Sequence, residues 1–446
     1  MAYAGSAWSP WATHTRSKRA RLTPASTPKG ENIVIPGSKS ITNRALIIAA
    51  LAEGQSILRG ILKSDDSYWC IEVLRNLGVV IKIEEDYVEV HGINGVWPNK
   101  HGNLYIGSAG TLARFLPGAL AVSPAGTWKI EASEQLSTRP IGPIIAALRH
   151  LGAHIDYLDD DGYCPIQVTA KGLVGGNLDI SGDISSQFIS GALLASPYAM
   201  SPVTINVTST LVPSAYVNIT MDLMQTFGAS VTCNPSFTSL VVKPSRYAGK
   251  ERELEADAST ACYFFAYAAL TGRRIRVANL RPDTNQPDFA FLKVLQKMGC
   301  TVIVDDGITV MGPDVLRGGF TIDMHAMSDQ ALTLCAIAPF ADKPIAITNV
   351  GHIRYHESDR IQVACAQLNT VGVPNVQRQD GFEVYPQLPH AGVIDPHGDH
   401  RVAMAFSLIG AVVPGIVMLD PGCVSKTCPP YFDMLASLGV RVSFED

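Results

Sequence analysis

Positively charged residues stand beside glycines and serines where helices are expected to begin. Lys39, Ser40 and Arg44 lie in PGSKSITNRAL, and Gly110 lies in IGSAGTLARFLPG. Free backbone N–H groups and the helix dipole favour a bound anion at such a helix start. These segments predict sites for phosphate or carboxylate groups, although each one alone is also typical of a solvated lysine or an ordinary cap.

Further candidates of this kind follow along the chain. Ser185, Ser186 and Gln187 in SGDISSQFISGALL offer hydroxyl and amide groups at a helix start, where the alternative is an ordinary serine cap. Arg139 precedes a proline-fixed turn in STRPIGP. The C-terminal half adds cations in RYHESDR, GDHRVAM and VSKTCPPYF, namely Arg360, Arg401 and Lys426. The alternative for each of these is a surface ion pair, worth about 0–1 kcal/mol.

Two carboxylates are embedded in similar segments. Asp329 stands just ahead of an apolar helix in DMHAMSDQALTLCAIA, where an N-terminal cap is the alternative, and Glu357 stands between His356 and Ser358. If the basic residues converge, this pair is suited to general acid and base catalysis. The sequence contains no G-x-S-x-G, H-E-x-x-H, Walker P-loop or G-x-G-x-x-G motif, so covalent hydrolysis and nucleotide binding have no support.

The elements that must position these residues recur with a regular period. An amphipathic run, an apolar residue, a glycine and a β-rich run occur six times, at Gly78, Gly152, Gly228, Gly299, Gly372 and Gly439. A helix that ends on a glycine and leads into a strand explains each pattern. Spacings of 67 to 76 residues predict six copies of one α/β unit, packed as two domains of three.

Composition excludes several classes of protein. The chain has 446 residues, of which 47% are hydrophobic and 17% charged, so it is not disordered over most of its length. The net charge of −5 gives no overall footprint for nucleic acid. The nine cysteines include no C-x-x-C pair, which predicts free thiols in a reducing compartment and argues against a zinc site.

Two further segments bear on membranes and targeting. The apolar stretch 402–419 is long enough for a membrane span, but Gly410, Pro414 and Gly415 divide it, which predicts a buried helix, a turn and a buried strand. The first 30 residues contain no Asp or Glu and five Lys or Arg. We expect residues 1–20 to form a flexible extension, with an organelle transit segment as the alternative.

Nine motifs, taken in order, resemble those of the 5-enolpyruvylshikimate-3-phosphate synthase family: PGSKSITNRAL, GSAGTLARF, EQLSTRPIGP, GDISSQF, PSAY, SDQALT, HESDR, GDHRVAM and SKTCPPYF. The resemblance implies a two-domain inside-out α/β barrel, each domain built from three β-α-β-α-β-β units. Residues 1–37 and 255–446 would form domain one, and 38–254 domain two. The implied reaction transfers the enolpyruvyl group of phosphoenolpyruvate to the 5-hydroxyl of shikimate 3-phosphate and releases phosphate, on the shikimate pathway to chorismate and aromatic amino acids.

The resemblance also implies the residues that bind each substrate. Phosphoenolpyruvate would contact Lys39, Gly110, Arg139, Gln187, Arg360, Arg401 and Lys426. Shikimate 3-phosphate would contact Lys39, Ser40, Arg44, Ser185, Ser186, Gln187, Tyr216, Asp329 and His356. Asp329 resembles the base on the attacking hydroxyl and Glu357 the acid that serves the methylene carbon, with Lys39 also catalytic. Because the substrates together carry about six negative charges, Lys and Arg side chains must offset their repulsion.

The family needs no metal or organic cofactor and is the target of glyphosate. We therefore expect a cytoplasmic monomer that takes two small-molecule substrates, with no nucleic-acid or membrane partner. The proposed cations come from both expected domains and should repel one another while no substrate is bound. The phosphate of shikimate 3-phosphate supplies opposite charge, so we expect the domains to close when it binds.

Some positions depart from the family pattern. Many members have Lys in place of His356 and Asn in place of His352, at positions that face the acceptor's ring hydroxyls. Pro213 stands where some members have a phosphate-binding Ser, with Ser214 adjacent, and Phe115 replaces a common Pro. Two alternatives therefore remain open: an enolpyruvyl transferase for another acceptor, such as an alcohol or a UDP-sugar, and a catalytically silent ligand-binding paralogue.

Overall fold

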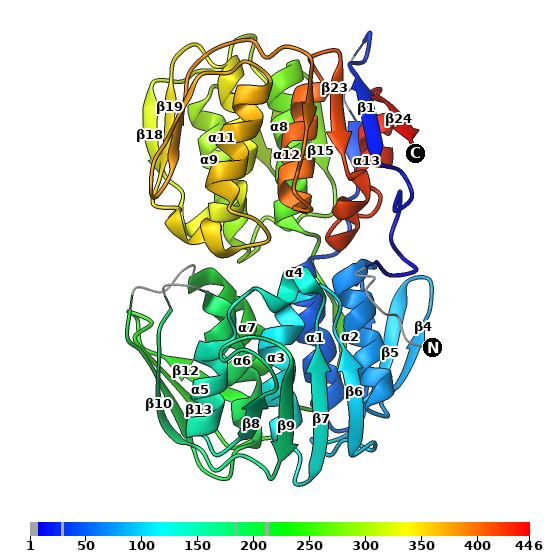
Figure 1. Cartoon of the computed structure of the whole chain (residues 1–446), viewed down its shortest axis with the longest axis vertical. Helices are drawn as coiled ribbons and strands as arrows, with labels where there is room; N and C mark the ends of the chain where they lie inside the picture. The colour runs from blue at the N-terminus through cyan, green and yellow to red at the C-terminus, as the bar shows by residue number, and fades with distance from the viewer. Residues whose placement is uncertain (1–7, 28–30, 183–184, 210–213) are drawn as a thin grey trace. The chain divides into compact units, whose positions relative to one another are not determined.

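The structure is a computed structural model that describes residues 8–27, 31–182, 185–209 and 214–446. Contacts divide these residues into two compact units (Figure 1). Unit 1 contains Gly37–Leu254 and the described residues up to Pro10, and unit 2 contains Trp11–Pro36 and Glu255–Asp446. The chain therefore passes between the units three times.

Unit 1 consists of three four-stranded sheets and the helices that pack between them. In spatial order the sheets are β14 (Glu251–Glu253), β3 (Gln55–Arg59), β5 (Tyr87–His91) and β4 (Val80–Ile83); β6 (His101–Tyr105), β7 (Gly126–Glu131), β9 (Ile166–Ala170) and β8 (His154–Tyr157); and β10 (Gly176–Ile180), β11 (Val203–Val207), β13 (Ser239–Lys243) and β12 (Ser230–Cys233). The helices are α1 (Lys39–Leu51), α2 (Asp65–Asn76), α3 (Gly110–Ala121), α4 (Glu134–Ser137), α5 (Gly142–His150), α6 (Ser186–Ala195) and α7 (Ser214–Thr226). Helix α3 is buried along its whole length and packs on α1 and α6.

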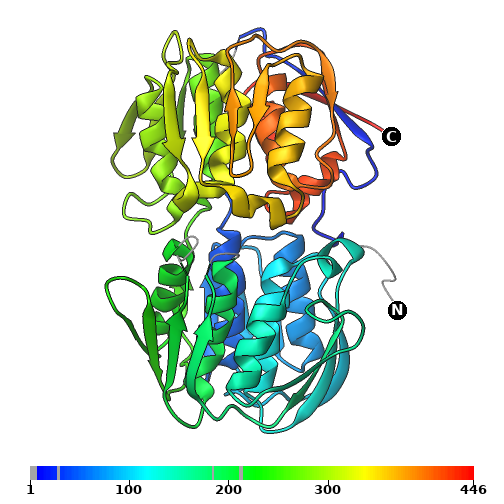
Figure 2. The same cartoon turned by 60° about the vertical axis from the view of Figure 1, so that its left-hand side comes forward.

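Unit 2 repeats this arrangement. Its sheets are β2 (Glu31–Ile33), β15 (Arg274–Val277), β17 (Ile308–Met311) and β16 (Thr301–Val304); β18 (Phe320–Asp323), β19 (Ile345–Thr348), β21 (Phe382–Val384) and β20 (Asn375–Gln377); and β22 (Gly392–Ile394), β23 (Ile416–Leu419), β1 (Arg19–Thr23) and β24 (Arg441–Glu445). The α-helices are α8 (Ala258–Thr271), α9 (Phe291–Lys297), α10 (Ala331–Ile337), α11 (Arg360–Thr370), α12 (His400–Gly410) and α13 (Tyr431–Ser437). Short 3₁₀ helices precede several of them: η2 (Pro287–Ala290), η3 (His325–Gln330), η5 (Gly351–Tyr355) and η6 (Pro421–Lys426). Figures 1 and 2 show the helices of each unit running alongside one another, with the sheets toward the outside.

All six sheets share one strand order, in which a parallel pair is followed by two antiparallel pairings. The three sheets of unit 2 follow the same rule, with β1 from the start of the chain completing the sheet of β22, β23 and β24. Two copies also exchange their first strands: β2 leads into α1 but pairs with β15, whereas β14 leads into α8 but pairs with β3. The predicted six copies of one α/β unit are confirmed.

The six glycines that revealed the period all end helices in the left-handed conformation, with φ between +77° and +99°. At Gly78, the Val79 N–H donates to the Leu74 carbonyl at 3.0 Å, and the glycine N–H donates to the Arg75 carbonyl at 2.9 Å. These are the two hydrogen bonds of a Schellman motif, and the other five glycines make the same pair. Each strand therefore leaves its helix in the same direction.

Two other expectations are confirmed. The apolar stretch 402–419 forms most of buried α12, a turn and β23. All nine cysteines lie in the described residues and are free. Within the described part of the chain, no helix is both long enough and apolar enough to cross a membrane.

The beginning of the chain differs from what we expected. Residues 19 and 20 already belong to β1, and the backbone N–H of buried Ser9 donates to Asp65 Oδ1 of unit 1 at 2.8 Å. Residues 8–18 thus pack on the protein where we expected a flexible extension, and residues 8–10 group with unit 1 where we expected domain one. Otherwise the expected boundaries at 37–38 and 254–255 stay predictions.

The helix-ending glycines yield a stability prediction. Gly228 has φ +94°, and a Cβ there would come no closer than 3.9 Å to its nearest neighbour, the Arg246 carbonyl oxygen. Gly228→Ala should therefore cost only the left-handed strain of about 1–2 kcal/mol in the free energy of unfolding. Gly102→Ala is the matched control, because Gly102 lies in β6 with ordinary φ and open space. Equal urea denaturation curves for the two variants would contradict the expected strain at Gly228.

Candidate active site

Arg44 lies inside unit 1, where it joins three helices. The residue is 1% exposed, and its Nε donates to Thr220 Oγ1 of α7 at 2.7 Å. Its Nη2 donates to Ser190 Oγ of α6 at 3.1 Å, and its Nη1 to the Ser40 carbonyl at 2.9 Å. Because these acceptors are uncharged, burial lowers the pKa of Arg44 to about 10, with a smaller opposing effect of Tyr216. The positive charge of Arg44 is not neutralised by these contacts.

The predicted residues at the starts of α1 and α6 lie near this guanidinium. Ser190 stands one helical turn after Ser186, so the two share a face of α6. The Tyr216 ring centre lies 6.0 Å from Arg44 Cζ. Ser185 does cap α6, since its Oγ accepts the Gln187 N–H at 3.2 Å. Pro213 and the side chain of Ser214 lie outside what the structure describes.

Lys39 opens α1 and faces α2, where its Nζ lies 3.7 Å from Asp66 Oδ2. This acidic partner is itself buried in the first turn of α2. Sequence reasoning did not find Asp66, because nothing in the segment before α2 resembles a binding motif.

Gly110 opens α3 against two arginines. A Cβ at this position would lie 3.0 Å from Arg139 Nη1 and 3.2 Å from Arg114 Nη1. Arg114 donates from Nη1 to the Gly110 carbonyl at 3.0 Å and from Nη2 to the Pro140 carbonyl at 2.9 Å. The structure thus brings Gly110, Arg139 and Arg114 together, and Arg114 stands beside Gly110 in the segment IGSAGTLARFLPG that the sequence already indicated.

Arg360, the first residue of α11, is the centre of a charged cluster in unit 2. It is 1% exposed and its guanidinium contacts three carboxylates. Nη1 lies 2.8 Å from Asp329 Oδ1 and Nη2 lies 2.9 Å from Glu357 Oε2. Nε and Nη2 both donate to Asp399, at 2.8 and 3.2 Å. Burial alone would lower the pKa of Arg360, but Asp399, Glu357 and Asp329 together raise it.

The other two predicted cations of unit 2 join the same carboxylates. Arg401 Nη2 lies 2.7 Å from Asp329 Oδ2, and Lys426 Nζ lies 3.7 Å from Glu357 Oε1. Asp329 therefore pairs with cations instead of capping α10, whose N-cap is Gln330. Arg360 and Arg401 are largely buried, so the alternative of surface ion pairs is wrong for them.

Histidines flank this cluster. Arg360 Nη1 lies 2.9 Å from His356 Nδ1, and since an arginine only donates, His356 accepts there as the neutral ring. His352 Nε2 lies 2.8 Å from Ser328 Oγ. Burial, reinforced by His325, lowers the pKa of His352 to about 4, so this ring too is neutral near pH 7.

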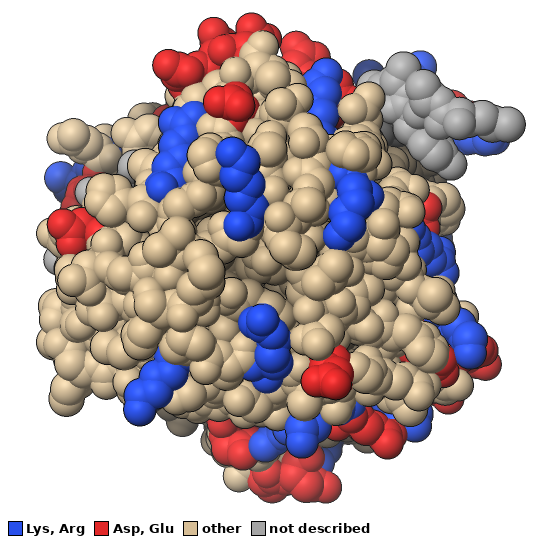
Figure 3. Space-filling view, turned by 90° about the horizontal axis from the view of Figure 1, so that it is seen from below, with Lys and Arg blue, Asp and Glu red and all other residues tan. Residues whose placement is uncertain are grey.

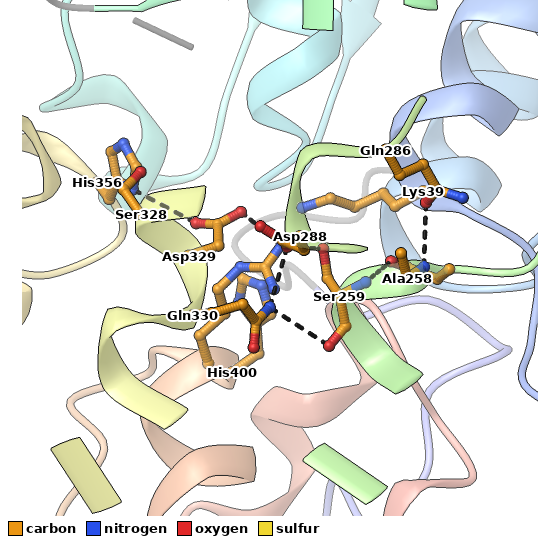
Figure 4. Close-up of polar contacts among 12 residues, drawn as sticks. Lys39, Ala258, Ser259, Gln286, Asp288, Ser328, Asp329, Gln330, His356 and His400 are labelled. Atoms are coloured by element: carbon orange, nitrogen blue, oxygen red, sulfur yellow. Dashed lines mark hydrogen bonds and ion pairs between the residues drawn. The ribbon is translucent and has the colours of Figure 1, made fainter. Parts of the chain in front are cut away.

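Asp288 lies beside Asp329 and belongs to a second buried network (Figure 4). Its Oδ2 accepts hydrogen bonds from Ser259 Oγ and, at 2.9 Å, from Gln330 Nε2. Burial, reinforced by the charge of Asp329, raises the pKa of Asp288 to about 6, while Arg401 acts in the opposite direction. Through Gln330, this network fixes the backbone next to Asp329.

Sequence reasoning missed Asp399 and Asp288. Asp399 is the N-cap of α12, where its Oδ1 accepts the Arg401 N–H at 2.9 Å. It belongs to the motif GDHRVAM, from which we took only Arg401 as a candidate. Asp288 had no comparable signal. Among the described residues, no group of three His, Cys, Asp or Glu side chains is arranged to hold a metal ion.

Buried cations and carboxylates thus stand at helix starts of a six-copy α/β fold, an arrangement suited to binding anions. A family model described as EPSP synthase (3-phosphoshikimate 1-carboxyvinyltransferase) matches residues 25–435. The chain belongs to this family, and the predicted family, fold and transferase class are confirmed.

Individual relatives support the same family assignment. The chain is 52% identical to 3-phosphoshikimate 1-carboxyvinyltransferase 2 of Halalkalibacterium halodurans over 98% of both chains. It is 39% identical to 3-phosphoshikimate 1-carboxyvinyltransferase of Trichormus variabilis, over 91% of this chain and 95% of the relative. A solved EPSP synthase structure from Acinetobacter baumannii matches the fold with a TM-score of 0.80 at 24% identity, covering 95% of this chain and 99% of that one.

The raised pKa of Asp288 predicts an unusual pH dependence. A carboxyl whose pKa is raised in the folded state stabilises that state below its unfolded pKa, and the contribution is lost as pH rises through about 6. Asp288→Asn removes this pH-dependent contribution, so the stability of the variant relative to wild type should increase between pH 4.5 and 7, by about 2 kcal/mol. Urea denaturation at several pH values measures the difference. A difference that does not vary with pH would show that Asp288 does not titrate in this range.

Proposed function

We propose that this protein transfers the enolpyruvyl group of phosphoenolpyruvate to the 5-hydroxyl of shikimate 3-phosphate, releasing phosphate. One observation carries the proposal: the Arg360 guanidinium holds both Asp329 and Glu357, at 2.8 and 2.9 Å. An acid and a base for one reaction must be fixed relative to each other, and a single planar fork does this.

The chemistry requires three proton transfers. Asp329 takes the proton of the 5-hydroxyl while the hydroxyl oxygen forms a bond to C2 of phosphoenolpyruvate. Glu357 gives a proton to the C3 methylene. The Glu357 carboxylate then takes a proton back from the methyl group formed at C3, which regenerates the double bond as the C2–O bond to phosphate breaks and phosphate leaves. Lys39 would assist by neutralising charge on the reacting groups.

For shikimate 3-phosphate, we propose that Ser40, Arg44, Ser185, Ser186 and Tyr216 bind the phosphate end. Support comes from Arg44, a buried cation whose hydrogen bonds go to uncharged oxygens. Serine hydroxyls at the start of α6 add donors for a phosphate. We propose that Lys39, Gln187, Asp329 and His356 contact the rest of this substrate.

For phosphoenolpyruvate, the proposed ligands are Lys39, Gly110, Arg139 and Gln187 of unit 1 and Arg360, Arg401 and Lys426 of unit 2. We expected the cations to repel one another before substrate binds. Within unit 2, however, Arg360, Arg401 and Lys426 already have carboxylate partners. An incoming anion would therefore exchange partners with these carboxylates. Domain closure stays a prediction.

We further propose a cytoplasmic monomer that has no nucleic-acid partner. The net charge of −5 supports the last point. On the face shown in Figure 3, Lys and Arg side chains are scattered among uncharged residues, and acidic side chains gather at two opposite edges. This face shows no basic stripe of the kind that a nucleic acid would need.

Removing either carboxyl charge should slow turnover. Asp329→Asn and Glu357→Gln should each lower kcat by about 10²–10⁴, the usual scale for a general acid or base. Glu383→Gln is the matched control and should leave kcat unchanged, because Glu383 lies on β21 and is half-buried in an ion pair with the exposed Arg378. Steady-state phosphate release measures all three. Near-normal turnover in both site variants would remove the proposed mechanism.

Acceptor choice is tested by phosphate release from phosphoenolpyruvate with a panel of alcohols. Shikimate 3-phosphate should support turnover, whereas shikimate without its phosphate should be poor because Arg44 and the serines would lack their ligand. Turnover with a UDP-sugar or another alcohol alone would establish a different acceptor. No turnover with any acceptor, despite binding of phosphoenolpyruvate, would indicate a silent paralogue.

A further inference from the structure

The segment of residues 11–18, which we call the N-terminal strap, precedes the part of the chain that the family model matches, which begins at residue 25. The strap belongs to unit 2 and leads into β1. The Lys18 N–H donates to the Glu445 carbonyl at 2.8 Å, and the Lys18 carbonyl accepts the Asp420 N–H at 3.0 Å. The strap is therefore fixed at its end between β24 and the residue before η6.

Thr13 ties the strap to the end of η6, which carries Lys426. Its backbone N–H donates to Ser425 Oγ at 2.8 Å, and Ser425 Oγ lies 3.2 Å from the Thr13 carbonyl. The Thr13 hydroxyl donates to the Pro429 carbonyl at 2.7 Å. These bonds hold the backbone on both sides of Lys426.

Packing reinforces the same contact. The His14 ring stacks on Phe444, with centroids 3.7 Å apart and planes 10° apart. The strap backbone also passes close to Gly422, where a Cβ would lie 3.1 Å from Thr15 Cα and 3.2 Å from the His14 carbonyl oxygen. Two features of unit 2 thus fit the strap closely: an aromatic ring on β24 and a glycine in η6.

The position of Lys426 depends on this backbone. Its Nζ lies 3.7 Å from Glu357 Oε1, and its side chain is only 9% exposed. A lysine has a flexible four-carbon stem, so where its ammonium rests is decided by the backbone that presents it. Ser425 is fully buried, and losing a buried hydrogen-bond partner costs more than forming the bond gains.

We propose that the N-terminal strap is a positioning element for Lys426, with Thr13 and Ser425 as its positioning residues. The strap acts through the backbone at Ser425 and Pro429 and does not touch substrate. This inference rests on the proposed role of Lys426 in binding phosphoenolpyruvate. It adds a part of the chain, outside the matched family region, that sets the affinity for that substrate.

The test compares KM for phosphoenolpyruvate in the full-length chain. Thr13→Val removes the donor to Pro429, and Ser425→Ala removes the acceptor of the Thr13 N–H. Each should raise this KM about three- to tenfold, the loss expected for one hydrogen bond. KM for shikimate 3-phosphate and kcat should change less than about twofold, because the strap acts through Lys426 alone.

Controls separate positioning from general stability. Thr13→Ser keeps the hydroxyl and should restore the wild-type KM, and Thr15→Val, an exposed change in the same strap, should have no effect. An unchanged KM in both Thr13→Val and Ser425→Ala would overturn the proposal. So would a lowered Tm with all kinetic constants altered together, since that would show a structural role only.

A Lys426→Gln variant in the same series distinguishes this proposal from the proposed function. If Lys426→Gln raises KM for phosphoenolpyruvate while the strap variants do not, only the strap proposal fails. If Lys426→Gln leaves that KM unchanged, the proposed role of Lys426 fails, and the strap proposal fails with it.

Discussion

The buried guanidinium of Arg360 is the constraint on which the site of unit 2 depends. Removing a cation from water costs several kcal/mol unless well-placed charges and hydrogen bonds replace the solvent. Asp329, Glu357 and Asp399 provide them, from the turn before α10, the turn before α11 and the start of α12. Both proposed catalytic carboxylates are therefore also structural partners, and neither can be removed without leaving part of a buried charge unmatched.

The repeated α/β unit explains why so many of the proposed functional groups lie at helix starts within each unit. In unit 1, Lys39, Gly110 and Ser186 begin α1, α3 and α6, the helices that follow the first strand of a copy. In unit 2, the corresponding helices α8 and α12 are capped by Asp257 and Asp399. Helix starts in unit 1 thus present N–H groups and cations, whereas those in unit 2 present carboxylates as well.

Local signals in the sequence were enough to predict the fold but only part of the site. The six helix ends could be predicted because a left-handed helix end favours glycine at one position, a signal that lies within a few residues of sequence. The partners of Arg360 could not be predicted from such a local signal. Asp329 and Asp399 stand 31 and 39 residues away in the chain and contact Arg360 only after folding. Asp288, Asp66 and the strap contact of Thr13 are hidden for the same reason.

A double-mutant cycle on kcat tests whether Arg360 holds the proposed acid and base as one unit. Arg360→Lys keeps the charge but loses the planar fork, and Glu357→Gln removes the acid. If the two act as one unit, the double variant should be no slower than the slower single variant, within about threefold. If the two losses multiply, Arg360 and Glu357 contribute independently, which would contradict a single unit built on the Arg360 guanidinium.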